Sequence, residues 1–397
     1  LLQSNLSSQN QRTPFCLIDV VVKPSKDNCR RGATVSVGTY RPSNCMEPSL
    51  KKQLENEWFT IEELRSSFSA IKANPLYRRT PVLVDCADML ALPGFSVDLK
   101  MESMQVSGSY KLRGIVWQLE KLKAKLEAGH HCGLVTMSAG NYGISLAICC
   151  RTYGIPCRVV MPDTSPQYKR QLVASLGAEE LCCQASNMSA LLDESQANGW
   201  LLSHPFDDLN LVCGYGTILM ELMDTIGLPD VVVVPAGPFA GGGLLCGIAL
   251  AARLLELPTK VFGVEVVPSE SNEKFKHCTP IGSCVRTVDS FAGGEMKGLP
   301  EKYVGENTFR ICFDCVDGVV SVPEDDLINA CAVLLDTAGI IVEPFAAGPV
   351  AALMTGKLDS CKGEKVVAII GSRNIELSDL LERQRSITQD TCAAVAR

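Results

Sequence analysis

The middle of the chain alternates short uninterrupted apolar runs with stretches in which apolar residues recur at helical spacing. The runs at 134–137, 157–161 and 181–183 predict strands, and the helical spacing over 141–153 and 168–176 predicts helices. A glycine follows each of the two predicted helices, where it ends the helical pattern. Strands that alternate with helices in this way predict βαβ units, and therefore a parallel sheet with helices on both faces.

A second series of the same kind follows towards the C-terminus. Its strands, such as the four valines at 231–234, are apolar on both faces, as the strands of a covered parallel sheet are. The predicted elements are strands 231–234, 261–266, 340–342 and 365–370 and helices 244–255, 323–338 and 346–354. With a length of 397 residues, the chain is expected to be an α/β protein of two domains or one large domain.

The N-terminal part has a different pattern. Residues 1–58 show no sustained periodicity and are expected to form an irregular leader. Thr60-Ile-Glu-Glu63 has the form of a helix capping box, and the helix that follows is expected to end at Asn74-Pro75. Another helix is predicted over 115–126, directly after the sequence Gly108-Ser-Tyr-Lys-Leu-Arg-Gly114.

One uncharged run, from Val231 to Ala252, is long enough to cross a membrane. Pro235, Pro238 and the three glycines 241–243 interrupt it, and such breaks would leave backbone polar groups without partners in lipid. The run therefore predicts a buried strand, a glycine loop and a buried helix, and we expect no association with a membrane.

The charge of the chain bears on its partners. A net charge of −7 provides no long-range attraction for nucleic acid or for an anionic membrane surface, both of which need clustered lysine and arginine. A small-molecule substrate is favoured, and no nucleic-acid partner is expected.

The 19 cysteines occur singly or as adjacent pairs, several of them inside apolar patterns, which is typical of small core residues. The close pair Cys312 and Cys315 has no second pair at zinc-finger spacing, so neither a metal site nor a redox dithiol is favoured. Reduced thiols indicate an intracellular protein. Residues 1–13 lack the pattern of a secretory signal, so we expect a cytoplasmic location, with a mitochondrial one as the alternative.

Three loops follow predicted strands and lead towards helices, where ligands bind in open parallel sheets. They are residues 138–143 (Ser-Ala-Gly-Asn-Tyr-Gly), 240–243 (Ala-Gly-Gly-Gly) and 371–374 (Gly-Ser-Arg-Asn). The glycines before helix 244–255 would let backbone N–H groups converge on an anion such as a phosphate; the alternative is a flexible loop or tight packing. Ser138 and Asn141 suit a carboxylate or a ring hydroxyl, with helix capping as the alternative.

Lys111 changes the interpretation of these loops. A lysine that can lose its charge on desolvation, a phosphate-binding loop and a nearby asparagine are what a pyridoxal phosphate Schiff base requires. Taken alone, Lys111 would be a solvated surface lysine.

Several separated motifs now point to one family. The segments GSYKLRG, SAGNYG, MPDTSPQYKRQLVASLGAE, HPFDD with GYGT, AGGGL, GVE, EPFAAG and GSRNI occur in this order along residues 60–385. In this the chain resembles the fold-type II pyridoxal phosphate enzymes, specifically the branch of serine/threonine dehydratases and serine racemases. The resemblance implies a two-domain α/β fold of parallel twisted sheets flanked by helices, and a homodimer. It implies a small domain (133–213) inserted in a large one (59–132 and 214–385), with a leader (1–58) and a tail (386–397).

The resemblance also implies roles for individual residues. Lys111 would bind pyridoxal 5'-phosphate covalently and shuttle the α-proton, while Tyr110 would lie behind the ring and Asn141 would bind the ring hydroxyl. Glu343 would border the ring, and Ser372 provides the hydroxyl nearest to the pyridine nitrogen. The phosphate would be bound by Ala240, Gly241, Gly242, Gly243 and Leu244, and the substrate carboxylate by Ser138, Ala139, Asn141 and Tyr142.

The sequence departs from the family at several of these positions. Ala139 stands where the racemases have a second serine, the acid on the opposite face, so a dehydratase is favoured. Tyr142 replaces the usual histidine, about three residues are inserted before the phosphate loop, and Ser372 is displaced by one position. At the family's divalent-metal position Glu265 is followed by Ser271 rather than an acidic residue, so we expect no metal site.

The resemblance therefore implies a pyridoxal-phosphate-dependent lyase that converts L-serine or L-threonine to a 2-keto acid and ammonia. One alternative is a serine racemase or a hydroxyaspartate ammonia-lyase. Another, favoured by the inserted phosphate loop, Tyr142 and the displaced Ser372, is a protein that binds pyridoxal phosphate with weak or no catalysis.

Overall fold

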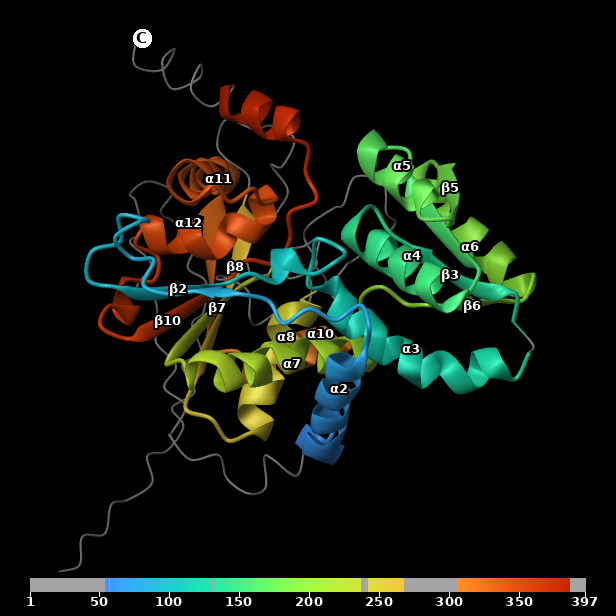
Figure 1. Cartoon of the computed structure of the whole chain (residues 1–397), viewed down its shortest axis with the longest axis horizontal. Helices are drawn as coiled ribbons and strands as arrows, with labels where there is room; N and C mark the ends of the chain where they lie inside the picture. Colours follow the sequence, from blue (N-terminus) through green and yellow to red (C-terminus); the bar gives the residue numbers. More distant parts are fainter. Residues whose placement is uncertain (1–53, 57, 130, 237–241, 268–305, 386–397) are drawn as a thin grey trace, which may run out of the picture. The chain divides into compact units, whose positions relative to one another are not determined.

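The computed structural model describes residues 54–56, 58–129, 131–236, 242–267 and 306–385 (Figure 1). All of them belong to one compact unit that begins at Pro42. The predicted tail and nearly all of the predicted leader lie outside the described residues.

The larger of the two sheets has six strands in the order β1-β2-β10-β7-β8-β9. The strands are β1 (Val82–Leu83), β2 (Ser96–Lys100), β7 (Val231–Pro235), β8 (Lys260–Val267), β9 (Gly318–Pro323) and β10 (Lys365–Ile369). All neighbours pair in parallel except β1, which is antiparallel to β2. Because parallel strands are joined by crossovers, helices cover this sheet on both faces, as the sequence predicts.

Successive residues of β7 face opposite sides of this sheet. Val232 and Val234 belong to the apolar cluster of α7 (Leu209–Ile226) and α8 (Gly243–Leu254). Val231 and Val233 belong to the cluster of α11 (Glu324–Ala338) and α12 (Gly348–Met354). This alternation explains why the strand is apolar at every position, since both of its faces are buried.

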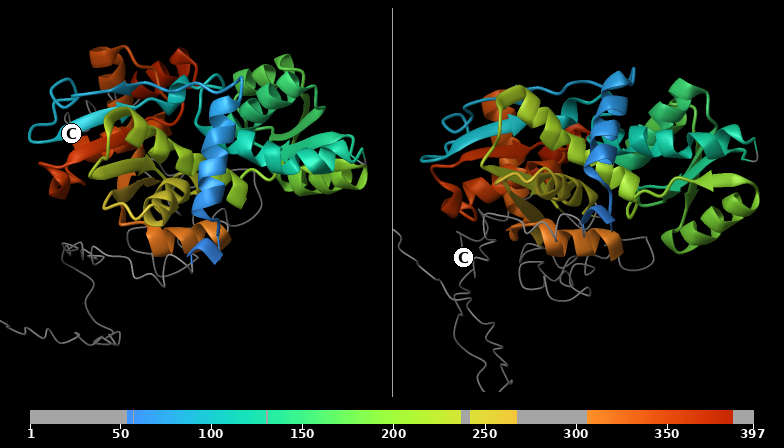
Figure 2. Two further views of the ribbon diagram at one scale, coloured as in Figure 1. Left: turned by 60° about the horizontal axis from the view of Figure 1, so that its bottom comes forward. Right: turned by 90° about the horizontal axis from the view of Figure 1, so that it is seen from below.

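The smaller sheet has four parallel strands in the order β5-β4-β3-β6, and its strands lie within residues 133–202. They are β3 (Gly133–Met137), β4 (Cys157–Pro162), β5 (Glu179–Cys183) and β6 (Trp200–Leu202). Helices α4 (Asn141–Tyr153) and α5 (Gln167–Ser175) cover one face and α6 (Met188–Ala197) the other (Figure 2). Helix α3 (Lys111–Glu127) packs against both α4 and α7.

Most predicted elements are present with ends shifted by one or two residues. The capping box at Thr60 forms, and α2 (Ile61–Ala73) ends before Asn74 as expected. Strands β1, β2, β6 and β9 and helices α6, α7 and α10 (Glu306–Cys315) were not among the predicted elements. Helix α3 begins at Lys111, four residues earlier than the predicted 115, which places Lys111 in its first turn.

The predicted strand 340–342 is wrong, because these residues form a connection without strand pairing. Gly339 closes α11 in a left-handed conformation, and the next N–H, of Ile340, donates to Leu334 O. Ile340 and Val342 are buried in the core but pair with no strand of the described structure. The central strand β7 already has β10 on one side and β8 on the other. An apolar run can therefore reflect burial of side chains without a place in a sheet.

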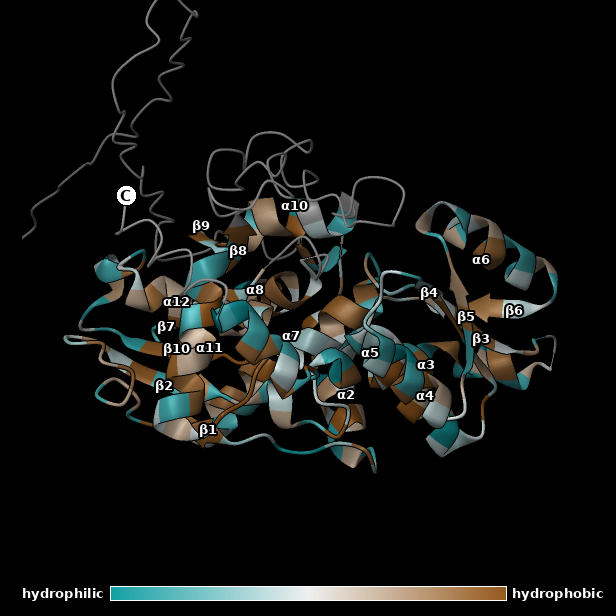
Figure 3. Cartoon of the chain, turned by 90° about the horizontal axis from the view of Figure 1, so that it is seen from above, coloured by the Kyte–Doolittle hydropathy of each residue, from teal (hydrophilic) through white to brown (hydrophobic). Residues whose placement is uncertain are grey.

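The uncharged run is strand β7 and helix α8, as predicted, and the loop at 237–241 lies outside the described residues. Figure 3, coloured by hydropathy, shows these elements among the other helices and strands of the fold. Across the part of the chain that the structure describes, no helix is both long and apolar enough to span a bilayer.

Candidate active site

Lys111 lies where the loop before α3 is fixed to the end of β10. Tyr110 donates its N–H to Gly371 O at 3.0 Å, and Arg373 donates its N–H to Gly108 O at 2.9 Å. Between them Ser109 and Ser372 form an antiparallel bridge. Two segments more than 250 residues apart in the sequence thus meet at the start of the lysine helix.

The Lys111 side chain is buried beside two aromatic rings. Its Nζ lies 4.8 Å from the centre of the Tyr110 ring and 5.6 Å from that of Tyr215. Burial lowers the pKa of Lys111 to about 8, because the protein interior disfavours the charged ammonium. No ion pair is found for Lys111 within the described ranges. A lysine in this setting is far more often neutral than a surface lysine, as a nucleophilic amine must be.

A buried ionic cluster fixes the first turn of α3 beneath Lys111. Arg113 donates to both carboxylate oxygens of Glu102, at 2.8 and 2.7 Å, and its Nη2 lies 2.9 Å from Glu221 Oε2. Lys100 Nζ lies 2.5 Å from Glu221 Oε1. The two basic and two acidic groups balance in charge, which is the condition for keeping ions in a protein core. The cluster ties α3 to α7 and β2.

Glu343 is the centre of a second polar cluster. Its Oε2 accepts from Asn141 Nδ2 and from Ser372 Oγ, each at 2.7 Å. Its Oε1 accepts from Lys169 Nζ at 2.8 Å, and Asn374 Nδ2 donates to Asn141 Oδ1 at 2.7 Å. Three of the predicted site residues, Asn141, Glu343 and Ser372, are thereby brought together.

Lys169 and Asn374 belong to this cluster but were not among the predicted site residues. Both stand inside the quoted motifs, Lys169 in the segment after β4 and Asn374 in the loop after β10. A polar residue within a site loop is a signal that could have found Asn374. Nothing local distinguishes Lys169 from the neighbouring Arg170, which pairs with Glu180 instead.

In the loop before α4, Ser138 Oγ accepts hydrogen bonds from the backbone N–H groups of Gly140, at 3.1 Å, and Gly143, at 2.9 Å. This is the capping-type contact that the sequence left open as an alternative role. Ala139 is partly exposed in the same turn. A Cβ on Gly140 would lie 3.3 Å from Lys169 Nζ, so the lysine cation flanks this loop.

The Tyr142 side chain points into the interior, where its hydroxyl donates to Gln118 Oε1 at 2.6 Å and lies 2.8 Å from Ser203 Oγ. Its phenol is therefore part of the support beneath the loop. The predicted contact of this residue with a substrate carboxylate stays a prediction.

The predicted phosphate loop is described only in part. Ala240 and Gly241 lie outside the described residues, whereas Gly242, Gly243 and Leu244 are buried at the start of α8. Gly242 has φ of 73°, a left-handed conformation that favours glycine. The N–H groups of the first turn of a helix have no partner within the helix, so this end suits an anion.

At the predicted metal position, Glu265 accepts a hydrogen bond from Ser321 Oγ at 2.6 Å, and Ser271 lies outside the described residues. Within the residues that the structure describes, no group of three or more His, Cys, Asp or Glu side chains is placed to bind a metal ion. The absence of a metal site in the whole chain stays a prediction.

The residues present fit a phosphorylated aromatic aldehyde. Lys111 would supply an amine of lowered pKa for the aldehyde, and the start of α8 would supply N–H groups for the phosphate. The hydroxyls of Tyr110 and Tyr215 are buried without a hydrogen-bond partner in the described structure, so polar groups remain to be satisfied beside Lys111. The cluster around Asn141 and Ser372 would meet the polar positions of the ring.

The chain is similar to known proteins over most of its length. A family model described as "Pyridoxal-phosphate dependent enzyme" matches residues 73–372. The catabolic L-threonine dehydratase of Staphylococcus aureus is 31% identical over 325 residues, which cover 80% of this chain and 89% of that protein.

Solved structures are also similar. The processed threonine deaminase isoform 2 of Solanum lycopersicum is 27% identical with a TM-score of 0.65, covering 81% of this chain and 92% of that one. The serine racemase of Dictyostelium discoideum is 28% identical with a TM-score of 0.65, covering 80% and 99%. The predicted α/β fold with two parallel-rich sheets is confirmed by these similarities.

Proposed function

Because the chain belongs to the family of pyridoxal-phosphate-dependent enzymes, we propose that it is a lyase which converts L-serine or L-threonine to a 2-keto acid and ammonia. The single observation that carries the proposal is Lys111, a buried lysine of lowered pKa at the start of α3. The similarity to a threonine dehydratase over most of both chains supports this choice of substrate class.

When bound, pyridoxal phosphate supplies an electron sink for the negative charge that develops on the substrate Cα. Lys111 Nζ would bind its aldehyde carbon and, once released by the substrate amine, would accept the proton from Cα. The two aromatic rings near this amine and its burial keep it dry, which favours the neutral form that can accept a proton.

The polar clusters would hold the reactants in place. Asn141, oriented by Glu343 and Asn374, would donate to the ring hydroxyl. Ser372, which donates to Glu343 in the structure, would turn its O–H to the ring nitrogen. A hydroxyl there, rather than a carboxylate, would leave the nitrogen neutral and favour elimination over transamination. Lys169, beside Gly140, would add positive charge where the loop before α4 receives the substrate carboxylate.

Ala139 separates this proposal from racemisation. Its methyl group has no proton to give to the opposite face of Cα, whereas a serine at this position would. The similarity to a serine racemase at 28% identity makes racemisation the second candidate. Measuring D-serine beside keto acid in one reaction mixture distinguishes the two.

We also propose the larger-scale organisation. The confinement of the four-stranded sheet to residues 133–202 supports a small domain at 133–213 within a large one at 59–132 and 214–385. The free cysteines among the described residues support a cytoplasmic location. The resemblance to the family supports a homodimer, which sedimentation of the purified protein would test.

Release of 2-keto acid from L-serine and L-threonine by the protein supplied with pyridoxal phosphate tests the function. Lys111→Ala should abolish turnover. Lys121→Ala is the matched control, because this exposed lysine lies on the same helix and pairs with Glu63 far from the site. Turnover that survives Lys111→Ala, or its absence in a wild type that shows the absorbance of bound cofactor, would contradict the proposal.

A further inference from the structure

Tyr215 comes from α7, but its ring lies between the first turns of two other helices. A Cβ built on Gly114 would lie 2.5 Å from Tyr215 Cε1 and 2.7 Å from Cζ, and one on Gly243 would lie 3.4 Å from Cε2. Gly114 is one helical turn beyond Lys111, and Gly243 is the first residue of α8. The phenol thus lies between the reactive lysine and the start of the helix that would bind a phosphate.

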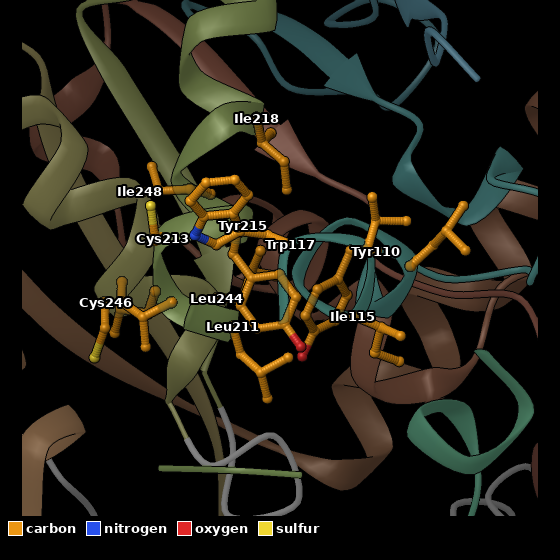
Figure 4. Close-up of a cluster of buried hydrophobic side chains, with 14 of the residues drawn as sticks. Tyr110, Ile115, Trp117, Leu211, Cys213, Tyr215, Ile218, Leu244, Cys246 and Ile248 are labelled. Carbon is orange, nitrogen blue, oxygen red and sulfur yellow. The ribbon is translucent and has the colours of Figure 1, made fainter. Parts of the chain in front are cut away.

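The hydroxyl of Tyr215 has no hydrogen-bond partner within the described structure, although it is shielded from solvent. The hydroxyl of Tyr110 is also buried without a partner there, and the two rings meet edge to face with centres 5.0 Å apart. Figure 4 shows their hydroxyls at the same end of the pair. Tyr142 is different, since its buried hydroxyl contacts Gln118 and Ser203. A buried hydroxyl without a hydrogen-bond partner costs free energy, so we expect a bound ligand to supply partners for these two phenols.

The start of α8 indicates what kind of ligand Tyr215 would meet. Gly242 is left-handed and precedes a helix of 12 residues, whose first N–H groups and positive dipole end favour an anion. Burial raises the pKa of Tyr215 well above its usual value, so the phenol keeps its proton and acts as a donor at neutral pH. A neutral donor beside a helix N-terminus suits a phosphate and not a cation.

We propose that Tyr215 binds the phosphate of the cofactor, its hydroxyl donating a hydrogen bond that adds to those of the backbone N–H groups at Gly243 and Leu244. This inference rests on the proposed function, because it takes pyridoxal phosphate as the ligand. Tyr110, the residue directly before Lys111, packs its ring beside Gly371, whereas Gly243 is met by the Tyr215 ring. We therefore assign Tyr110 to the ring of the cofactor and not to its phosphate.

Equilibrium binding to the apoenzyme tests the inference with two ligands that differ only in the phosphate. The dissociation constants of pyridoxal phosphate and of pyridoxal are measured by fluorescence quenching for the wild type, Tyr215→Phe and Tyr110→Phe. Each substitution removes one unpartnered oxygen, so the folds should be retained, which thermal melting verifies. Tyr215→Phe should weaken binding of pyridoxal phosphate about tenfold or more and leave that of pyridoxal within about twofold, since a hydrogen bond to a charged group is lost.

Tyr110→Phe is the matched control and should change both constants by the same factor. An unchanged affinity of Tyr215→Phe for pyridoxal phosphate, or an equal loss for both ligands, would overturn the role assigned to Tyr215 while leaving the proposed function intact. A wild type that binds neither ligand would remove the premise of the proposed function as well, so the two failures are distinguishable.

Discussion

Lys169 and Glu343 form an ion pair whose Nζ and Oε1 atoms are 2.8 Å apart, with side chains only 14% and 13% exposed. The pair connects α5, which covers the four-stranded sheet, with the segment that follows α11 in the six-stranded part of the fold. Glu343 also accepts from Asn141 and Ser372, but both of these donors are uncharged. Lys169 therefore supplies the positive charge that balances the Glu343 carboxylate. The ion pair is therefore expected to matter for the site more than an exposed pair would.

Replacing Lys169 should impair use of the substrate. Lys169→Met is expected to raise KM for L-serine about tenfold, with a smaller change in kcat, because the cation beside Gly140 and Glu343 is lost. Lys169→Arg should recover most of the loss. Steady-state kinetics would show this, with Arg170→Met as the control, since Arg170 pairs with Glu180. Equal KM values in the Lys169→Met and control variants would contradict the prediction.

The lowered pKa of Lys111 should appear in the rate of cofactor binding. Only the neutral amine attacks an aldehyde, and burial places the pKa at about 8. The second-order rate constant for association of pyridoxal phosphate with the apoenzyme should thus rise about tenfold per pH unit below that value and level off above it. Stopped-flow absorbance at a series of pH values from about 6 to about 10 would measure this rate constant. A rate that still rises steeply above pH 9.5 or so would indicate an ordinary lysine.

The ionic cluster beneath Lys111 should govern stability at low pH. Burial disfavours the charge on Glu221, but Arg113 and Lys100 outweigh it and lower the pKa of this carboxyl to about 2. The folded pKa is below the unfolded value, so the stability that the carboxylate contributes is present above about pH 4.5 and is lost as pH falls towards 2.

Glu221→Gln should consequently destabilise the protein by about 3 kcal/mol near pH 7, because two buried cations lose a charged partner. The difference from wild type should shrink as the pH falls below about 4.5. Urea unfolding at a series of pH values would test both statements. Asp224→Asn is the control, because that carboxylate forms an exposed ion pair with Lys72. A pH-independent difference would mean that the charge of Glu221 is not what stabilises the fold.

Restoring a hydroxyl at position 139 should change the products. In Ala139→Ser, a proton donor would stand in the loop before α4, and the ratio of D-serine to keto acid formed from L-serine should rise about tenfold or more. Chiral chromatography of the reaction mixture measures this ratio. If the variant forms keto acid at the wild-type rate and no D-serine, the residue at 139 does not decide between elimination and racemisation.

The sequence predicted the strands and helices near the site because their signals are local. Residues 141–153 form a helix at the predicted positions, with Gly140 at its N-cap. The strand predicted at 340–342 failed, since the same apolar character serves a buried connection and a sheet strand. The predicted start of α3 was four residues too late. Hydrogen bonds to the residues after β10 hold the loop before Lys111, and no local pattern in the sequence reveals them.

By itself the sequence determined the α/β character of the protein, the order of its strands and helices around the site, and Lys111 as the candidate nucleophile. Apolar periodicity and turn residues act over a few positions, so they can be recognised without a structure. Only the tertiary structure decided the partners of the site residues. Asn141 meets Glu343 across 202 positions and Asn374 across 233, and Tyr215 reaches the start of α8 from another helix. Such contacts depend on how the sheets and helices pack, because side chains distant in sequence are brought together only when their elements share a buried face.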